Sequence, residues 1–201
     1  CEIMAWKFGA TREASDAFAA SSHARAIEAT RRGFFHEQII PVQVGSETVT
    51  DDNTARADAT ADTLARLKPA FDRDNGIITP GNSSRFSDGA GALLIGSLRS
   101  ARESGLPALA AIRDYCLVGT PSLREEMLLG PAMSIPKLLH RNGLGYDDID
   151  VWEIHEAFAT QVLINRQCMA DRDFVRARFG DQAPVGEIPL EKLNAWGGSL
   201  S

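Results

Sequence analysis

The first quarter of the chain predicts a helix followed by a strand. Thr11 can cap a helix with Glu13 in its first turn, where a carboxylate favours the positive end of the helix dipole. Gly33 is a suitable end for this helix. Between them, small apolar residues recur near helical spacing, at Ala17, Ala20, Ala24 and Ile27. Apolar residues then alternate with other residues, as in a half-buried strand, at Ile40, Val42 and Val44.

The middle of the chain predicts a loop, short helices and one apolar strand. Residues 45–59 are polar and acidic, which indicates a loop. Residues 60–67 predict a short helix that Pro69 stops, because the residue before a proline disfavours helical backbone. Residues 90–96 are small and aliphatic, which is typical of a buried strand. Residues 99–104 continue as a short helix.

From about residue 88 onward, strand-like and helical stretches alternate along the chain. The later predicted elements are, in order, a helix from Pro131 to Gly143, a strand over 147–154, helices over 156–169 and 171–179, and a strand over 193–201. Such alternation is typical of layered α/β structure. The pattern therefore predicts the α/β fold class.

Composition narrows the function classes without changing this picture. Of 201 residues, 44% are hydrophobic and 24% are charged, which is ordinary for a globular protein. The net charge of −6 argues against general nucleic-acid binding, because that binding needs a basic face to neutralise phosphates. No apolar run approaches the ~20 residues that span a bilayer. We therefore expect neither a nucleic acid nor a membrane-spanning segment.

The cysteines indicate the compartment and exclude the usual zinc patterns. Cys1, Cys116 and Cys168 are widely spaced and form no CxxC pair, so we expect no metal site. A reducing compartment is the simplest interpretation, which predicts the cytoplasm, or an organelle matrix in a eukaryote. Free cysteine is commonly a small buried hydrophobe, and we expect that role for Cys116 and Cys168.

Four short motifs carry the strongest functional signal. An apolar run delivers His155 and Glu156 to the predicted start of a helix, and polar groups at strand ends are well placed to meet substrate. The motifs are, in chain order, Gly81-Asn82-Ser83-Ser84, Leu128-Leu129-Gly130-Pro131, His155-Glu156-Ala157-Phe158 and Asn194-Ala195-Trp196-Gly197-Gly198-Ser199. In that order they resemble the thiolase family. The HEAF motif, where many thiolases have NEAF, looks most like the beta subunit of the fatty-acid-oxidation trifunctional enzyme.

This resemblance implies the thiolase fold, with layers in the order α-β-α-β-α. In the family's terms, residues 1–86 would be the later part of the loop domain that covers the active site. Residues 87–201 would be the first part of the second core domain. The resemblance covers nearly the whole chain but only about the middle half of a thiolase. We therefore expect an internal piece of a longer protein.

The resemblance also implies roles for His155 and Glu156. Thiolases cleave or form 3-oxoacyl-CoA through a cysteine thiolate and an acyl-enzyme, and both steps place negative charge on an oxygen. By match, His155 helps to stabilise this oxyanion, because an imidazole can donate through a ring N–H. The alternative is a histidine that bonds a neighbouring carbonyl. Glu156 either supports the active site or interacts with the helix dipole, and the sequence leaves these alternatives open.

Three further residues are candidate contacts of coenzyme A or its acyl chain. Ser84 matches a family serine near the pantetheine arm, and Arg56 aligns with an arginine near the nucleotide in some relatives. Met127 is a candidate substrate contact, because methionine tolerates varied ligand shapes. The alternatives are a surface loop for Ser84, a solvated charge for Arg56 and core packing around Met127.

The resemblance predicts thiolysis of 3-oxoacyl-CoA in fatty-acid beta-oxidation, with coenzyme A as co-substrate and no covalently bound cofactor. The nucleophilic cysteine and the histidine of the family's GHP motif are expected outside these residues, so the chain alone is expected to be inactive. A non-catalytic thiolase-like protein that binds acyl-CoA or lipid is the alternative. The expected partners are acyl-CoA, a second subunit in a homodimer, and a hydratase/dehydrogenase alpha subunit.

Overall fold

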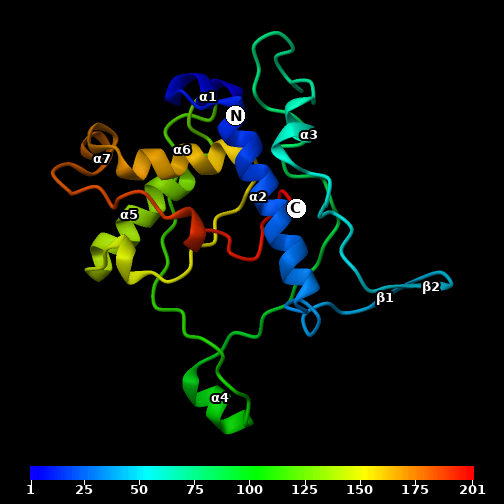
Figure 1. Ribbon diagram of the computed structural model, residues 1–201. Coiled ribbons are helices and arrows are strands. Elements are labelled where there is room, and N and C mark those ends of the chain that lie inside the picture. The colour runs from blue at the N-terminus through cyan, green and yellow to red at the C-terminus, as the bar shows by residue number, and fades with distance from the viewer.

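The computed structural model describes residues 1–201 and consists mainly of helices joined by long extended segments (Figure 1). The elements in chain order are α1 (Glu2–Phe8), α2 (Arg12–Arg31), β1 (Val42–Val44), β2 (Glu47–Val49), α3 (Ala61–Ala65), α4 (Leu98–Ser104), α5 (Gly130–Asn142), the 3-10 turn η1 (Tyr146–Asp148), α6 (Ala159–Ala170), α7 (Arg172–Phe179) and the 3-10 turn η2 (Leu190–Lys192). None of the helices combines the length and apolar character that crossing a bilayer requires.

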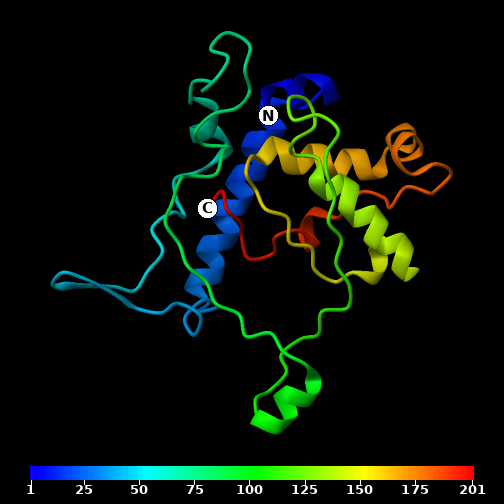
Figure 2. The same ribbon diagram turned by 180° about the vertical axis from the view of Figure 1, so that it is seen from behind.

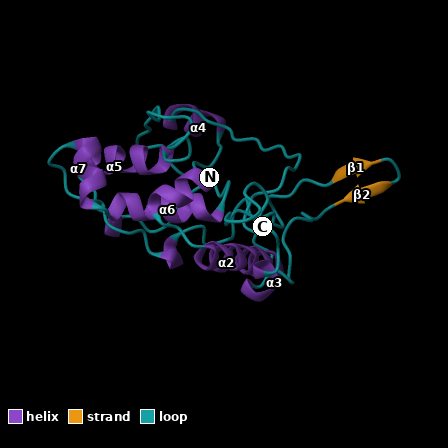
Figure 3. Cartoon of the chain, turned by 90° about the horizontal axis from the view of Figure 1, so that it is seen from above, coloured by secondary structure: helices purple, strands orange, loops and turns teal.

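Helix α6 is the centre of the hydrophobic core. It contacts α1, α2, α5 and α7, and its residues Val162, Ile164 and Met169 have no exposed surface. Seen from above, α2 and α3 lie on one side of α6 and α5 lies on the other (Figure 3). The start of α6 lies beside the first turn of the long helix α2, where the Ser15 and Thr160 hydroxyls are 2.7 Å apart.

The helix ends follow local sequence signals, as predicted. The Thr11 side chain accepts a hydrogen bond from the Ala14 N–H at the start of α2. Asp171 caps α7 in the same way, through the Phe174 N–H at 2.7 Å. Gly143 ends α5 in the left-handed conformation, with φ at 63°, where a residue without a Cβ is favoured. These boundaries depend on neighbours in the sequence and are confirmed.

The buried face of α2 differs from the predicted one. Ala17 and Ala24 of the predicted apolar stripe are exposed. The residues of α2 that are buried are Ser15, Asp16, Phe18, Ala19, Ser22, His23, Ala26 and Ala29. The prediction was wrong because the buried polar residues of this face find hydrogen-bond partners in distant segments, which removes the usual cost of burying them.

The predicted strand around Val42 is present but is not half-buried. β1 pairs with β2 in an antiparallel hairpin, with Val42 opposite Val49, and the hairpin projects away from the helices (Figure 1). All six of its residues are exposed. β2 also lies within the stretch predicted to be a loop. Two short strands make a hairpin with each other, but no helix or further strand covers either face.

Residues 90–96 are not a buried strand, contrary to the prediction. Leu93 and Leu94 are 89% and 86% exposed, and the segment has no regular structure. It belongs to the long excursion that carries α4 away from the core (Figures 1 and 2). A strand needs a neighbouring backbone to complete its hydrogen-bond ladder, and no other segment runs beside this one.

Candidate active site

The site is built on two extended segments that meet through Trp152. The Trp152 N–H donates to the Lys192 carbonyl, and the Asn194 N–H donates to the Trp152 carbonyl, both at 2.8 Å. Trp152 and Leu193 form a parallel bridge at this point. The segments predicted as strands over 147–154 and 193–201 therefore meet, but their pairing is limited to this bridge.

Helix α6 begins three residues later than predicted. Phe158, with φ at −146° and ψ at 140°, is the last extended residue, and Ala159 is the first helical one. Glu156 consequently lies outside the first turn, so a helix-dipole interaction does not explain it. Successive side chains of an extended backbone point to opposite sides, so the Glu156 side chain is buried while the neighbouring His155 is exposed.

Asn194 clamps the backbone on the N-terminal side of His155. Its Oδ1 accepts from the Ile154 N–H at 2.8 Å, and its Nδ2 donates to the Ile154 carbonyl at 2.8 Å. The same Nδ2 donates to Glu156 Oε1 at 2.6 Å. Asn194 has a φ of 48°, a left-handed conformation that asparagine tolerates better than most residues. One buried amide thus fixes the backbone on which His155 is carried.

Glu156 is the centre of a buried group that we call the carboxylate network, made of Ser22, Glu156, Asn194, Gly198 and Leu200. The Glu156 carboxylate has no exposed surface and also accepts from Ser22 Oγ at 2.7 Å and from the Leu200 N–H at 3.2 Å. A Cβ on Gly198 would collide with this carboxylate. A buried charge is tolerated when its lone pairs are satisfied, and here three donors reach two oxygens.

His155 lies directly above this network, on its exposed side. Its Nδ1 is 2.9 Å from Ser199 Oγ, and Ser199 Oγ also accepts from the Glu156 N–H at 2.9 Å. The other ring nitrogen, Nε2, has no hydrogen-bond partner within the chain, and the His155 residue is exposed. The imidazole is therefore held at one nitrogen and available at the other.

The serine-rich turn lies beside the same segment. The Ser84 N–H donates to the Ala157 carbonyl, and the Ala159 N–H donates to the Asn82 carbonyl, both at 3.0 Å. Ser83 forms an antiparallel bridge with Phe158. Two sequence motifs that begin 74 residues apart are thus brought into direct contact. Hydrogen bonds fix the backbone both before and after His155.

This arrangement can present a hydrogen-bond donor from a rigid support. A donor that is already oriented stabilises a developing oxyanion without reorganisation during the reaction. The Asn82 side chain supports the same region, because it is buried, bonds the Thr79 N–H at 2.8 Å and donates to Asp16 at 2.8 Å. These features suit chemistry at a carbonyl carbon.

Comparison with known protein families identifies the family to which this chain belongs. The family of the thiolase N-terminal domain matches residues 1–98, and that of the thiolase C-terminal domain matches residues 106–201. This chain belongs to the thiolase family. The matches lie on either side of residues 99–105, and together they include all four motifs that carry the resemblance.

Curated relatives of this thiolase chain are named 3-ketoacyl-CoA thiolase. That of Yersinia enterocolitica is 36% identical over 202 aligned residues, which cover 100% of this chain and 46% of the relative. That of Serratia proteamaculans is 37% identical with the same coverage. The chain therefore spans about half the length of the curated relatives it matches.

Solved structures confirm the thiolase fold. The dimeric peroxisomal thiolase of Saccharomyces cerevisiae matches with a TM-score of 0.83 and 34% identity, covering 100% of this chain and 46% of that one. Human mitochondrial 3-ketoacyl-CoA thiolase in complex with CoA matches with a TM-score of 0.81 and 32% identity, covering 99% and 45%. The predicted α/β fold class and the predicted family are both confirmed.

Arg56 lies near the site through its backbone, while its side chain is paired elsewhere. The Arg56 N–H donates to His23 Nδ1 at 3.2 Å, and the guanidinium makes two hydrogen bonds to Asp58. Burial lowers the pKa of His23, and the positive charges of Arg56 and Arg85 lower it further. The Arg56 backbone thus contacts the buried face of α2 at His23, while its side chain is paired with Asp58.

Met127 is not among the residues gathered around His155. It is 55% exposed and precedes α5. The side chain of its neighbour Glu126 is bonded to Lys7 and Arg178, which ties this loop to α1 and α7. The structure therefore places Ser84 against Ala157, the residue after Glu156, bonds the Arg56 backbone to His23 of α2, and leaves Met127 on a separate loop.

None of the three cysteines has the surroundings of an activated nucleophile. Cys168 is 1% exposed, and burial raises its pKa to about 12, which keeps the thiol protonated. Its predicted role as a small buried hydrophobe is confirmed. No group of three or more His, Cys, Asp or Glu side chains is arranged to hold a metal ion.

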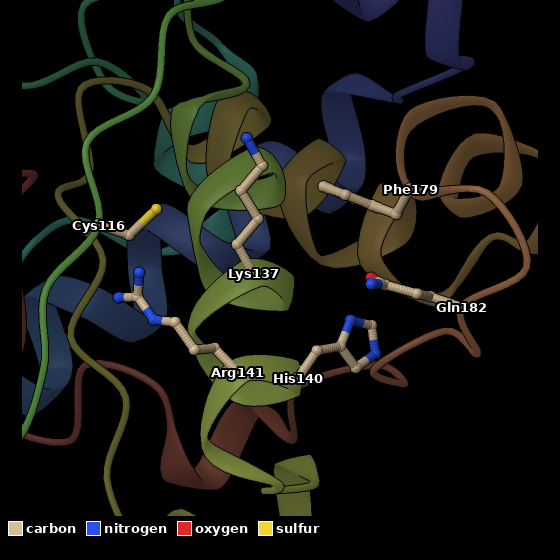
Figure 4. Close-up of a pocket in the computed structure, with 6 residues that line it drawn as sticks. All are labelled: Cys116, Lys137, His140, Arg141, Phe179 and Gln182. Carbon is tan, nitrogen blue, oxygen red and sulfur yellow. The ribbon is translucent and has the colours of Figure 1, made fainter.

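Cys116 is half-exposed, so its predicted burial was wrong. It borders a pocket of about 450 Å³ together with Lys137, His140, Arg141, Phe179 and Gln182. Figure 4 shows that three of these side chains come from successive turns of α5, with Cys116 on one side and Phe179 on the other. The pocket shares no residue with the carboxylate network.

Sequence reasoning assigned no role to Ser22, Asn194 and Ser199, which hold the predicted site residues in place. Asn194 and Ser199 are the first and last residues of the fourth motif and carry side chains that its glycines lack. Ser22 gives a weaker signal, since Ser15 and Ser22 are seven residues apart and therefore share one face of α2. Polar residues at that spacing, on a helix otherwise rich in alanine, were the available clue.

Proposed function

We propose that this chain is the oxyanion-stabilising part of an acyltransferase that cleaves 3-oxoacyl-CoA with coenzyme A, as in fatty-acid beta-oxidation. The observation that carries the proposal is the outward His155 imidazole, fixed at Nδ1 and open at Nε2 beside the serine-rich turn. Attack on a thioester or keto carbonyl places negative charge on its oxygen. An N–H donor held at that point lowers the energy of the charged intermediate.

The remaining candidate residues have supporting roles in this proposal. Ser84, whose N–H is fixed by the Ala157 carbonyl, would line the path of the pantetheine arm. Arg56 would meet the nucleotide end of CoA if its guanidinium were shared with Asp58, because arginine offers several donors to phosphate. Met127 would contact the acyl chain. Residues 1–86 would be the later part of the loop domain, and residues 87–201 the first part of the second core domain.

The proposed subtype is the trifunctional beta-subunit type. Its support is His155 in place of the asparagine of many thiolases, together with the long segment between α6 and the Trp196 motif. The proposed assembly is a homodimer that also pairs with a hydratase/dehydrogenase alpha subunit, in the cytoplasm or an organelle matrix. A dimeric relative and a CoA-bound relative among the matching structures are consistent with the dimer and the co-substrate.

The nucleophile and its activating base lie outside these residues in this proposal. Cys168 is buried and protonated, and neither Cys1 nor Cys116 has a histidine within hydrogen-bond reach. The same observation favours one alternative, a non-catalytic thiolase-like protein that binds acyl-CoA or lipid. Such a protein would keep the ligand-facing residues without turning over substrate.

The test is thiolysis of 3-oxoacyl-CoA by the complete gene product, compared between the wild type and variants at position 155. His155→Ala removes the donor and is expected to lower kcat by about 100- to 1000-fold. His155→Asn supplies an amide donor and is expected to retain much more activity. His36→Ala is the matched control, because His36 is exposed and makes no side-chain hydrogen bond.

The two candidate functions predict different results in this assay. Turnover by the wild type that collapses in His155→Ala supports the acyltransferase. Saturable acyl-CoA binding with no turnover by the complete gene product favours the non-catalytic alternative. Residues 1–201 assayed alone are expected to give no turnover. If His155→Ala were as active as the wild type, the proposed role of the imidazole would be wrong.

A further inference from the structure

Ser199 is the only residue of the chain that bonds the His155 ring. Its Oγ lies 2.9 Å from His155 Nδ1 and 2.9 Å from the Glu156 nitrogen. The hydroxyl therefore stands between a ring nitrogen that can either donate or accept and a backbone N–H that can only donate.

The two contacts together select one direction for the hydrogen bond to the ring. Ser199 Oγ accepts from the Glu156 N–H, and its own hydrogen then has His155 Nδ1 as its one acceptor within the chain. In the reverse arrangement, with a hydrogen on Nδ1, the serine hydrogen would find no acceptor in the protein. The Ser199 hydroxyl both accepts and donates within the chain only when Nδ1 carries no hydrogen. This pairing places the single N–H hydrogen of a neutral ring on Nε2.

The position of the hydroxyl is itself fixed by its neighbours in the sequence. The Gly198 N–H donates to Ser22 Oγ at 3.2 Å, and the Leu200 N–H donates to Glu156 Oε2 at 3.2 Å. The backbone at Gly198 and at Leu200, one residue before and one residue after Ser199, is therefore bound to the buried carboxylate network. These bonds hold the Ser199 backbone in place, and the Glu156 N–H holds its Oγ.

We propose that Ser199 is a positioning residue, which holds the His155 ring in the tautomer that presents an N–H donor from Nε2. This inference rests on the proposed function, since the value of such a donor lies in stabilising an oxyanion. Glu156 acts one step further back, because its main-chain N–H orients the serine, and its carboxylate binds the Leu200 N–H directly and the Gly198 backbone through Ser22. Nothing in the HEAF motif alone assigns a role to the serine 44 residues away.

The direct test reads the tautomer in the complete gene product labelled with ¹⁵N-histidine. At alkaline pH, where a free imidazole is neutral, the two ring nitrogens report which one carries the hydrogen. The His155 signals are assigned from their loss in His155→Asn, and exposed His36 serves as the reference for an unconstrained ring. We expect His155 to be a single Nε2–H tautomer, distinct from His36.

Three variants test whether the Ser199 hydroxyl itself sets the tautomer of the His155 ring. Ser199→Ala is expected to move the His155 signals to those of His36, and Ser199→Thr, which keeps the hydroxyl, to restore the wild-type pattern. Ser201→Ala is the matched control, because Ser201 bonds only the Gly198 carbonyl. A hydrogen on Nδ1 in the wild type, or unchanged His155 signals in Ser199→Ala, would overturn the inference.

Kinetics on the same variants test the consequence for the reaction. Ser199→Ala is expected to lower kcat about fivefold with little change in KM, the size of one lost hydrogen bond. Combined with His155→Asn, the same change is expected to have no further effect, because no imidazole remains to be oriented. An equal fivefold loss in both backgrounds would indicate a merely structural serine and count against the proposal. Absence of thiolysis in every protein would refute the proposed function, while the tautomer measurement would still decide the role of Ser199.

Discussion

The region around Glu156 buries polar groups, whereas the segment from residue 85 to residue 121 exposes apolar side chains. Around Glu156, polar groups are buried and each finds a partner: Ser22, Asn194 and the Leu200 N–H reach one carboxylate. In the other segment, apolar side chains such as Leu94 and Leu109 are exposed and no strand pairs with them.

This contrast shows that buried hydrogen bonds within the chain fix the conformation around Glu156 but not that of residues 85–121. Burying a carboxylate is costly unless donors satisfy it, so the residues around Glu156 must adopt one arrangement together. Exposed leucines gain nothing from a fixed position. The residues around Glu156 therefore form one hydrogen-bonded unit, and residues 85–121 donate no hydrogen bond to it. Substitutions in the two regions should differ accordingly.

Asn194→Ala should produce the largest loss of stability. It removes the partner of the Ile154 N–H, the Ile154 carbonyl and Glu156 Oε1 at once, and all three are buried. Leaving buried polar groups and a buried charge without partners is expected to lower the free energy of unfolding by about 3–5 kcal/mol. Urea unfolding followed by circular dichroism measures the change.

The matched control for this variant is Asn53→Ala. Asn53 is exposed and its side chain makes no hydrogen bond, so a change within about 0.5 kcal/mol is expected. Equal effects of the two substitutions would show that the Asn194 amide does not hold the site together.

A pair of identical substitutions compares the regions directly. Gly198→Ala would place a methyl group against the Glu156 carboxylate, and overpacking of this kind costs about 1–3 kcal/mol. Gly89→Ala adds the same methyl group where no atom lies within 4 Å, and it is expected to be neutral or to stabilise by up to about 1 kcal/mol. Thermal unfolding of both variants checks the prediction. A neutral Gly198→Ala would mean that the carboxylate can move away, and that the network is less rigid than its contacts indicate.

Local chemistry explains which features could be predicted from the sequence. Thr11, Gly143 and Asp171 mark helix ends because capping depends on residues within one turn. His155 and Glu156 were recognised as a site through the family motif. Their supports were not, because Ser22 and Ser199 act across long sequence separations, and a serine leaves no pattern that distinguishes a buried partner from a solvated one.

The wrong predictions have tertiary causes. The spacing of Ala17 and Ala24 is helical, but periodicity does not reveal that the opposite face of α2 meets the carboxylate network. Residues 90–96 form a short apolar run of the kind found in buried strands, yet a strand forms only beside another strand. In both cases the local preference was identified correctly, and the environment that decides burial lay elsewhere in the chain.

Protonation of His23 should lower the stability of the folded protein at acidic pH. Burial, with help from Arg56 and Arg85, lowers the pKa of His23, so the folded protein resists protonation there while the unfolded chain takes up a proton near pH ~6.5. Stability from this group is therefore fully present above that pH and falls as the pH falls through it. His23→Asn, which keeps an acceptor for the Arg56 N–H, should flatten the fall. The measurement is the urea midpoint across the pH range. An unchanged slope in His23→Asn would assign the acid sensitivity to other groups.

Leu94→Ala should have the smallest effect of these substitutions. The side chain is 86% exposed and lies on a segment that no strand accompanies, so its removal is expected to change the free energy of unfolding by less than about 0.5 kcal/mol. A buried leucine such as Leu129, which is 1% exposed, would lose about 2–5 kcal/mol on the same substitution. Urea unfolding of both variants gives the two values. A loss at Leu94 as large as that at Leu129 would show that residues 90–96 are packed against something, and that the contrast between the two regions disappears in solution.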